Sequence, residues 1–242
     1  MKRGLFILLF LFLNLLYGQI TYQKPDTNLI LRANNQFEVA SLLIDSDVAF
    51  FEKAKKELIN GYQVYHLEIQ VPDAKYLNIY FDVLKINQNS VLEIYNNQND
   101  LVLNITSSSN PGGKLYAIRP IKGDKIKFVY KGSHSNSKVV IGQIGYFWKS
   151  FEGISSSGYC EVDVNCSEGE KWEDEKNGIV RLLLKRSSSS IYCSGTLINN
   201  TSRDCRPFIL TAEHCAENVT KDGLNQSIAF FNYEKAICNA GN

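Results

Sequence analysis

Short segments in which apolar and polar residues alternate restrict the fold of this chain more than any other feature. Alternation with a period of two is typical of a β-strand that buries one face. Clusters of turn-forming residues separate the segments, and their regular spacing predicts an antiparallel β-sandwich of the jelly-roll type. About seven such segments occur, at 65–71, 76–83, 91–95, 101–105, 115–118, 125–130 and 139–148.

One segment before these strands has a helical pattern instead. Ser46 or Asp47 can cap its beginning, and Asn60-Gly61 can end it. The apolar residues between these signals are Phe50, Phe51, Ala54, Leu58 and Ile59. The pattern predicts a helix over about 47–59.

The first residues have the layout of a secretory signal peptide. A basic start, Met1-Lys2-Arg3, precedes an apolar run over residues 5–16, and Tyr17-Gly18 supplies a small residue at the end. The run is shorter than the roughly 20 apolar residues that span a bilayer. The alternative is a single N-terminal anchor helix. We expect a signal peptide over 1–18 and a protein that is secreted, periplasmic or on the cell surface, with no stable membrane insertion after cleavage.

All six cysteines lie between Cys160 and Cys238. An exported chain meets an oxidising compartment, so an even number of cysteines favours disulfides, although the spacing alone does not choose the pairs. Their distribution also divides the chain. We predict a cysteine-free sandwich over 19–149, a Gly/Ser-rich linker over 150–157 and a disulfide-bonded part over 158–242.

Charge and the isolated histidines point to no binding site in the first part. The chain has 26 basic and 25 acidic residues and no basic cluster, which gives no reason to expect nucleic-acid binding. His66 and His134 stand far from other residues that bear catalytic chemistry. We interpret His66 as a strand side chain and His134 as a loop residue.

Two segments of the last part carry a recognisable pattern. Residues 191–198 read IYCSGTLI, and residues 208–215 read FILTAEHC, each beginning as an apolar strand. The pair resembles the histidine-bearing region of trypsin- and chymotrypsin-like serine proteases. A general base must stay within hydrogen-bond reach of its nucleophile, and a strand-end histidine beside a disulfide has little freedom to drift.

Two further segments extend the likeness. GYCEVDVNCSEG at 158–169 resembles the start of the mature lysyl endopeptidase-type enzymes of bacteria, and FFNYEKAIC at 230–238 resembles a later strand of that family. The resemblance covers 158–242 in three blocks that follow one another in the same order as in the family. The β-rich residues 19–149 are similar to the prosegments of such precursors. The implied fold is a sandwich prosegment followed by the first, histidine-bearing β-barrel of a trypsin-like fold.

The resemblance assigns roles residue by residue. It makes His214 the general base of a Ser-His-Asp triad. It pairs Cys193 with Cys215, which lie 22 positions apart, and Cys166 with Cys238. In the family, the partner of the cysteine that matches Cys160 lies far downstream. No family partner is assigned to Cys205, and a pairing between Cys160 and Cys205 stays open.

The triad also needs an aspartate and a serine, which in this family follow the matched blocks. Residues 1–242 contain no Gly-Asp-Ser-Gly-Gly-like or Gly-x-Ser-Gly-x-Pro segment. We therefore expect the N-terminal fragment of a serine endopeptidase precursor that does not cleave peptides by itself. The substrates implied are proteins or peptides, Lys specificity comes only from the subfamily, and no metal or organic cofactor is implied.

Two alternatives remain. The first is a zinc site made of His214, Cys215 and Cys205. The adjacency of His214 and Cys215 argues against it, because neighbouring residues cannot easily bind one tetrahedral centre. The second is a non-catalytic secreted β-sandwich that binds a surface or partner and carries a degenerate protease barrel.

A processing site is a further hypothesis. Lys149 is the only basic residue between Lys138 and Lys171, and it lies just before the linker. A Lys-specific enzyme would release its prosegment there. The prosegment would then assist folding or hold the protease inactive.

Overall fold

β-Strands make up most of the regular structure. The computed structural model describes residues 18–26, 38–150 and 162–238, and the all-β class expected from the sequence is confirmed. The strands are β1 (Gly18–Thr21), β2 (Val39–Ala49), β3 (Lys55–Ile59), β4 (Tyr62–Gln70), β5 (Tyr76–Lys85), β6 (Val91–Tyr95), β7 (Leu101–Ile105), β8 (Tyr116–Ala117), β9 (Ile121–Lys122), β10 (Lys125–Lys131), β11 (Lys138–Phe147), β12 (Ile179–Lys185), β13 (Ser189–Ile198), β14 (Phe208–Leu210) and β15 (Ile228–Phe231). The helices are α2 (Phe50–Lys53), η1 (Ser167–Trp172), α3 (Glu173–Lys176), α4 (Glu213–Ala216) and α5 (Lys221–Asn225).

The N-terminal part is a two-layer sandwich. One layer is a six-stranded sheet in the order β1-β4-β10-β6-β7, with β3 beside β4. The other layer is formed by β2, β11, β5, β8 and β9, which belong to a nine-stranded sheet. Apart from the parallel β1–β4 pair, neighbouring strands of the first layer run antiparallel, as expected from the regular spacing of the strand segments.

The core lies between the two layers. It is filled by inward-facing residues such as Leu67 of β4 and Phe128 of β10 from one layer, and Ile79 of β5 and Ile144 of β11 from the other. These four side chains have no exposed surface. Because side chains alternate between the faces of a strand, the period-two pattern of the sequence places one apolar set in this core.

The predicted helix over 47–59 is wrong except at Phe50–Lys53. Only α2 is helical there, with the ring of Phe50 fully buried. Residues 47–49 are the end of β2, and residues 55–59 are β3, which forms a hairpin with β4. Asn60 and Gly61, interpreted as a helix end, have φ of 50° and 82° and make the hairpin turn. Two consecutive residues with positive φ suit a tight hairpin turn, and Asn-Gly is a preferred pair for it.

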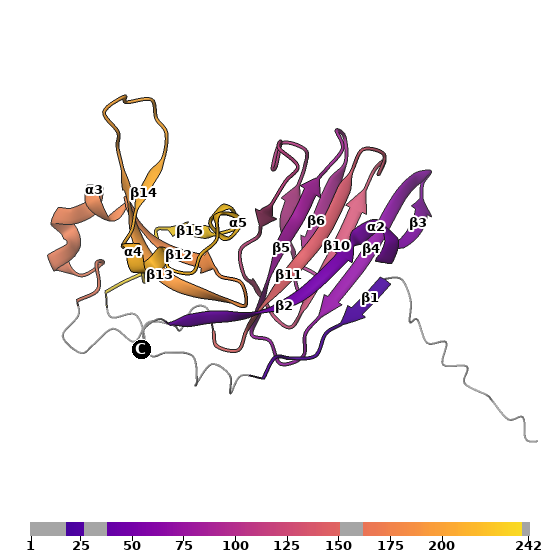
Figure 1. Cartoon of the computed structure of the whole chain (residues 1–242), viewed down its shortest axis with the longest axis horizontal. Coiled ribbons are helices and arrows are strands. Elements are labelled where there is room, and N and C mark those ends of the chain that lie inside the picture. The colour runs from indigo at the N-terminus through magenta and orange to yellow at the C-terminus, as the bar shows by residue number, and fades with distance from the viewer. Residues whose placement is uncertain (1–17, 27–37, 151–161, 239–242) are drawn as a thin grey trace, which may run out of the picture.

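The two parts of the chain share one sheet. The nine-stranded sheet runs β15-β12-β13-β2-β11-β5-β8, so β2 of the sandwich lies directly beside β13 of the C-terminal part. Figure 1 shows β2 reaching from the sandwich to the C-terminal strands. The sequence predicts two parts joined by a linker and does not predict this pairing. Residues 151–157 of that linker lie outside the described residues.

Within the described residues, the helices are all too short to cross a membrane. The predicted signal peptide falls almost wholly on residues 1–17, which are outside the described part. Cleavage after Gly18 would leave Gln19 to Thr21 of β1 paired with β4. The signal peptide therefore stays a prediction.

His66 makes the stability of the sandwich depend on pH. Its side chain is buried in β4, and its Nε2 lies 3.7 Å from Oε2 of Glu57. Burial lowers the pKa of His66 below its ordinary value; Glu57 opposes the shift, and Lys55 and Lys131 add to it. Between the lowered pKa and about 6.5, the unfolded chain binds more protons at this residue than the folded chain. Stability must therefore fall as the pH drops through this window.

Replacing His66 by glutamine is expected to flatten this dependence. The test is urea unfolding of the sandwich at several pH values between about 7 and 5. The control is Gln98→Ala, a change at an exposed residue with no titratable side chain, and it should keep the wild-type slope. An unchanged slope in His66→Gln would contradict the assignment.

Candidate active site

His214 lies on a short helical turn rather than at the end of a strand. The predicted strand over 208–215 is regular only in β14, and His214 belongs to α4, which follows Ala212. The amide of Cys215 donates to the carbonyl of Ala212 at 3.0 Å, which closes the turn. The imidazole is exposed. This turn presents the histidine to solvent while its neighbour Cys215 points into the protein.

A disulfide fixes that turn to the adjacent hairpin. Cys215 is 3% exposed and is bonded to Cys193 of β13. Cys215 packs in a cluster of buried residues that includes Val180 and Leu182 of β12 and Ile191 of β13. The residue next to His214 is therefore held both covalently and by packing.

A side-chain hydrogen bond fixes the segment of chain that precedes His214. The hydroxyl of Thr211 donates to the carbonyl of Ser194 at 2.7 Å, which ties the segment after β14 back to β13. Gly195 allows these strands to pack closely, because a Cβ there would lie 2.6 Å from Cγ2 of Ile209. Together with the disulfide, these contacts limit the movement expected of His214.

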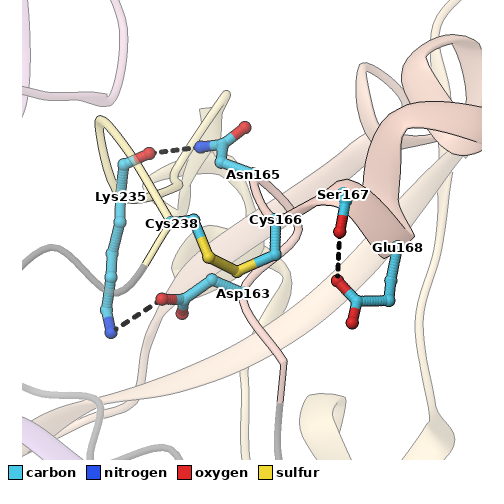
Figure 2. Close-up of a disulfide and its surroundings, with 7 residues drawn as sticks. All are labelled: Asp163, Asn165, Cys166, Ser167, Glu168, Lys235 and Cys238. Carbon is cyan, nitrogen blue, oxygen red and sulfur yellow. Dashed lines mark hydrogen bonds and ion pairs between the residues drawn. A yellow bond between two sulfur atoms is a disulfide. The ribbon is translucent and has the colours of Figure 1, made fainter.

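A second disulfide closes the C-terminal part. Cys166 is bonded to Cys238, 72 positions away. Figure 2 shows polar contacts around it: Lys235 pairs with Asp163 at 3.1 Å, and the side-chain Nδ2 of Asn165 donates to the backbone carbonyl of Lys235. The start of this part is thus tied to its other end.

Both disulfides are the pairs that the resemblance implies. Disulfides of this kind are typical of proteins exported to an oxidising compartment. Cys205 is exposed and is a free thiol. Cys160 falls outside the described residues, and the pairing with Cys205 that the sequence left open does not fit a free Cys205 thiol.

The sulfur atoms of Cys193 and Cys215, near His214, are bonded to each other in a disulfide. The ligand atoms of Cys193, His214 and Cys215 lie within 4.8 Å of one another. Zinc binds cysteine as a thiolate, and two sulfurs bonded to each other are not thiolates. The zinc alternative of the sequence analysis used Cys205, which is not a member of this group. The cluster therefore fits a structural disulfide beside a histidine better than a metal centre.

Sequence reasoning missed an arginine between two tyrosines near β15. The guanidinium of Arg181 lies 3.8 Å from the ring centre of Tyr192 and 4.5 Å from that of Tyr233. Burial raises the pKa of the Tyr192 hydroxyl, and Arg181 opposes that shift. The largely apolar run at 179–185 is typical of a strand, but no local pattern indicates which rings Arg181 meets.

The comparisons with known proteins concern the part of the chain that contains His214. Residues 154–242 match the family model described as lysyl endopeptidase, C-terminal domain. A lysyl endopeptidase from Pseudomonas aeruginosa is 31% identical over 106 residues, which is 39% of this chain and 23% of that protein. The chain resembles the lysyl endopeptidase family. It spans less than a quarter of the length of this relative, and the match of 154–242 contains His214 and both disulfides.

Proposed function

We propose that this chain is part of the precursor of a secreted serine endopeptidase in which His214 is the general base. The observation that carries the proposal is the setting of His214, an exposed imidazole beside a buried disulfide, within the region that matches lysyl endopeptidases. The family model covers the C-terminal part alone, which supports a prosegment role for the sandwich.

The proposed chemistry is acyl transfer through a Ser-His-Asp triad. His214 accepts the proton of the serine hydroxyl as the oxygen attacks the peptide carbonyl, and then gives that proton to the leaving amine. An aspartate holds the imidazole in the correct tautomer and stabilises its charged form. We assign this serine and aspartate to residues outside 1–242, so these residues alone are expected to be inactive.

An exposed apolar hairpin supports this assignment. The outer half of β13 and all of β14 expose large apolar side chains, and Figure 1 shows the hairpin standing away from the rest of the structure. The exposed residues are Leu197, Ile198, Phe208, Ile209 and Leu210. A contiguous exposed apolar surface marks an interaction site. In this proposal, the remainder of the protease domain covers it.

Lys149 is the proposed site of prosegment release. It is exposed and lies two residues after the end of β11. The preceding Trp148 packs against the sandwich core, and Phe147 is fully buried. The carbonyl of Phe147 accepts from the amide of Lys75 at 2.8 Å. A protease needs an extended stretch of substrate on both sides of the bond, so the end of β11 must detach before cleavage after Lys149.

The proposal is tested with the product of the complete gene. Purified protein is assayed on peptides that differ only in having Lys, Arg, Leu or Glu before the scissile bond, and the mature N-terminus is sequenced. We expect hydrolysis, preferred after Lys, and a mature chain that begins at Ser150. No hydrolysis of any peptide would contradict the protease assignment and favour the non-catalytic binding protein. A different N-terminus would contradict only the release site.

A further inference from the structure

The turn of the β3–β4 hairpin consists of two residues, Asn60 and Gly61. Ile59 and Tyr62 on either side of it are paired, and the φ angles of the two turn residues are 50° and 82°. Both turn residues are exposed. A two-residue turn with positive φ at both positions favours Asn followed by Gly, because these residues adopt that conformation with little strain. The fold therefore holds this dipeptide at the protein surface.

An Asn-Gly pair is also a reactive dipeptide. The backbone nitrogen of the second residue can attack the side-chain carbonyl carbon of the asparagine, and glycine has no side chain to hinder the attack. Asparagine is accordingly among the thermally labile residues of proteins. The space at Gly61 is open, since a Cβ there would meet no atom outside the turn within 4 Å. Among the described residues, none forms a hydrogen bond with the side chain of Asn60 or with the amide of Gly61.

The strand before this turn is held mainly by its backbone. β3 has no buried side chain, and 72% of the surface of Leu58 is exposed. It pairs with β4, and a side-chain contact between the two strands, the Glu57–His66 ion pair at 3.7 Å, is polar. Figure 1 shows β3 at the end of the sandwich that is far from the C-terminal part. A segment with few buried contacts opens locally at little cost in free energy, so the turn can reach the conformation that the attack requires.

A second Asn-Gly pair in the same chain provides an internal comparison. Asn177 and Gly178 follow α3, and Asn177 is exposed. Both reacting groups are engaged here. Nδ2 of Asn177 donates to the carbonyl of Glu173 at 2.8 Å, and the amide of Gly178 donates to the carbonyl of Glu175 at 3.0 Å. The two dipeptides therefore share their covalent chemistry and differ in how the fold restrains them.

We propose that Asn60 is a site of spontaneous deamidation at which isoaspartate forms. The nitrogen of Gly61 loses its proton to a base in the solvent and bonds to Cγ of Asn60. The bond between Cγ and Nδ2 breaks, and Nδ2 takes a proton from water and leaves as ammonia. Water then opens the resulting cyclic imide. Opening at Cγ gives aspartate, and opening at the backbone carbonyl gives isoaspartate, in which the main chain runs through Cγ.

This reaction oxidises and reduces nothing, and water is its only co-reactant. It needs no enzyme, so the inference goes beyond the proposed protease function and does not depend on it. The positive φ values that make Asn-Gly suitable for the turn keep the reactive pair at this position. The hairpin thus carries its own site of chemical ageing.

Isoaspartate at position 60 is expected to detach β3 from the sheet. It adds one carbon atom to the backbone of the turn, and the length of a hairpin turn sets the register of its strands. The pairs from Ile59–Tyr62 to Lys55–His66 then cannot all keep their positions. β4 should stay in place, because it also pairs with β10. The modification therefore opens one edge of the sandwich and leaves its core intact.

The test follows the whole folded chain over time. The purified chain is incubated at neutral and at mildly alkaline pH and digested, and mass spectrometry with enzymatic methylation of isoaspartate measures both Asn-Gly sites. A sample digested without incubation corrects for deamidation during digestion. We expect Asn60 to deamidate faster at the higher pH, mostly to isoaspartate, and Asn177 to react roughly tenfold more slowly or less. Equal rates at the two sites, or an unchanged Asn60, would overturn the proposal.

Unfolding the chain separates the effect of the fold from that of the local sequence. In urea, the hydrogen bonds that restrain Asn177 and Gly178 are lost, so the two sites should deamidate at similar rates. A difference that persists in urea would show that the neighbouring residues, and not the hairpin, set the rate at Asn60. That result would overturn the structural basis of the proposal.

A pair of variants separates the new charge from the longer backbone. Asn60→Asp adds the charge and keeps the length of the main chain, and Asn60→Gly has no side-chain amide and suits the same turn. Hydrogen exchange is measured for residues 55–59 in both variants and in the aged wild-type chain. We expect exchange to rise, by roughly tenfold or more, only in the aged wild type, while residues 125–131 of β10 keep their rate. Fast exchange in fresh Asn60→Asp, or normal exchange in the isoaspartate form, would contradict the detachment of β3.

Discussion

Replacing His214 by alanine in the complete protease is expected to lower kcat for peptide hydrolysis by about 10⁴- to 10⁶-fold. Without the imidazole, the serine hydroxyl has no base to accept its proton, and the leaving amine has no acid. Substrate binding is left in place, so KM should change little. Initial rates on a Lys-containing peptide measure both constants.

The control for this variant is His134→Ala. His134 is an exposed loop residue of the sandwich whose Nδ1 lies 2.8 Å from the hydroxyl of Tyr65. Its loss should leave the kinetic constants of the mature enzyme unchanged. Circular dichroism and the melting temperature establish that the His214→Ala protein is folded. A folded His214→Ala enzyme that retains a tenth or more of the wild-type kcat would contradict the assigned role.

Removing the Cys193–Cys215 disulfide is expected to lower the free energy of unfolding of the C-terminal part by about 3 kcal/mol. The bond closes a loop between residues 22 positions apart, and the chain-entropy model gives this magnitude for a loop of that size. The double variant Cys193→Ala, Cys215→Ala tests it by denaturant unfolding. The midpoint falls because the unfolded chain gains the freedom that the cross-link removed.

Cys205→Ser is the matched control for the disulfide. Cys205 is exposed and free, so its replacement should change the free energy of unfolding by no more than a few tenths of a kcal/mol. In the complete enzyme, the double variant should also lower kcat, because the turn that carries His214 loses its covalent anchor. Equal stability of the double variant and Cys205→Ser would contradict a structural role for the bond.

The sandwich was predictable because its signals are local. Alternating residues such as those of β5 and β10 and the turn clusters between them indicate strands without any knowledge of their partners. The structure of region 47–59 was not predictable from local signals, because Asn60-Gly61 suits both a helix end and a hairpin turn. Tertiary packing decided between them: Phe50 is buried in the core, and β3 pairs with β4.

The candidate site was predictable in its residues and less so in its geometry. The motif predicts the Cys193–Cys215 disulfide, which the structure contains, while the catalytic role of His214 stays a prediction. It does not reveal that Thr211 and Ala212 end the strand and that His214 sits on a helical turn. The pairing of β2 with β13 leaves no local signal, because Ser41 and Ser190 are 149 positions apart and meet only through the fold.

The measurement that tests the protease assignment most directly is covalent labelling of the complete gene product with a fluorophosphonate, a reagent that reacts with activated serines. Peptide mapping then locates the label. The account predicts one labelled serine, in a Gly-x-Ser-Gly-like segment outside residues 1–242, and loss of the label in the His214→Ala variant. Absence of any label, or a label that persists without His214, would contradict it.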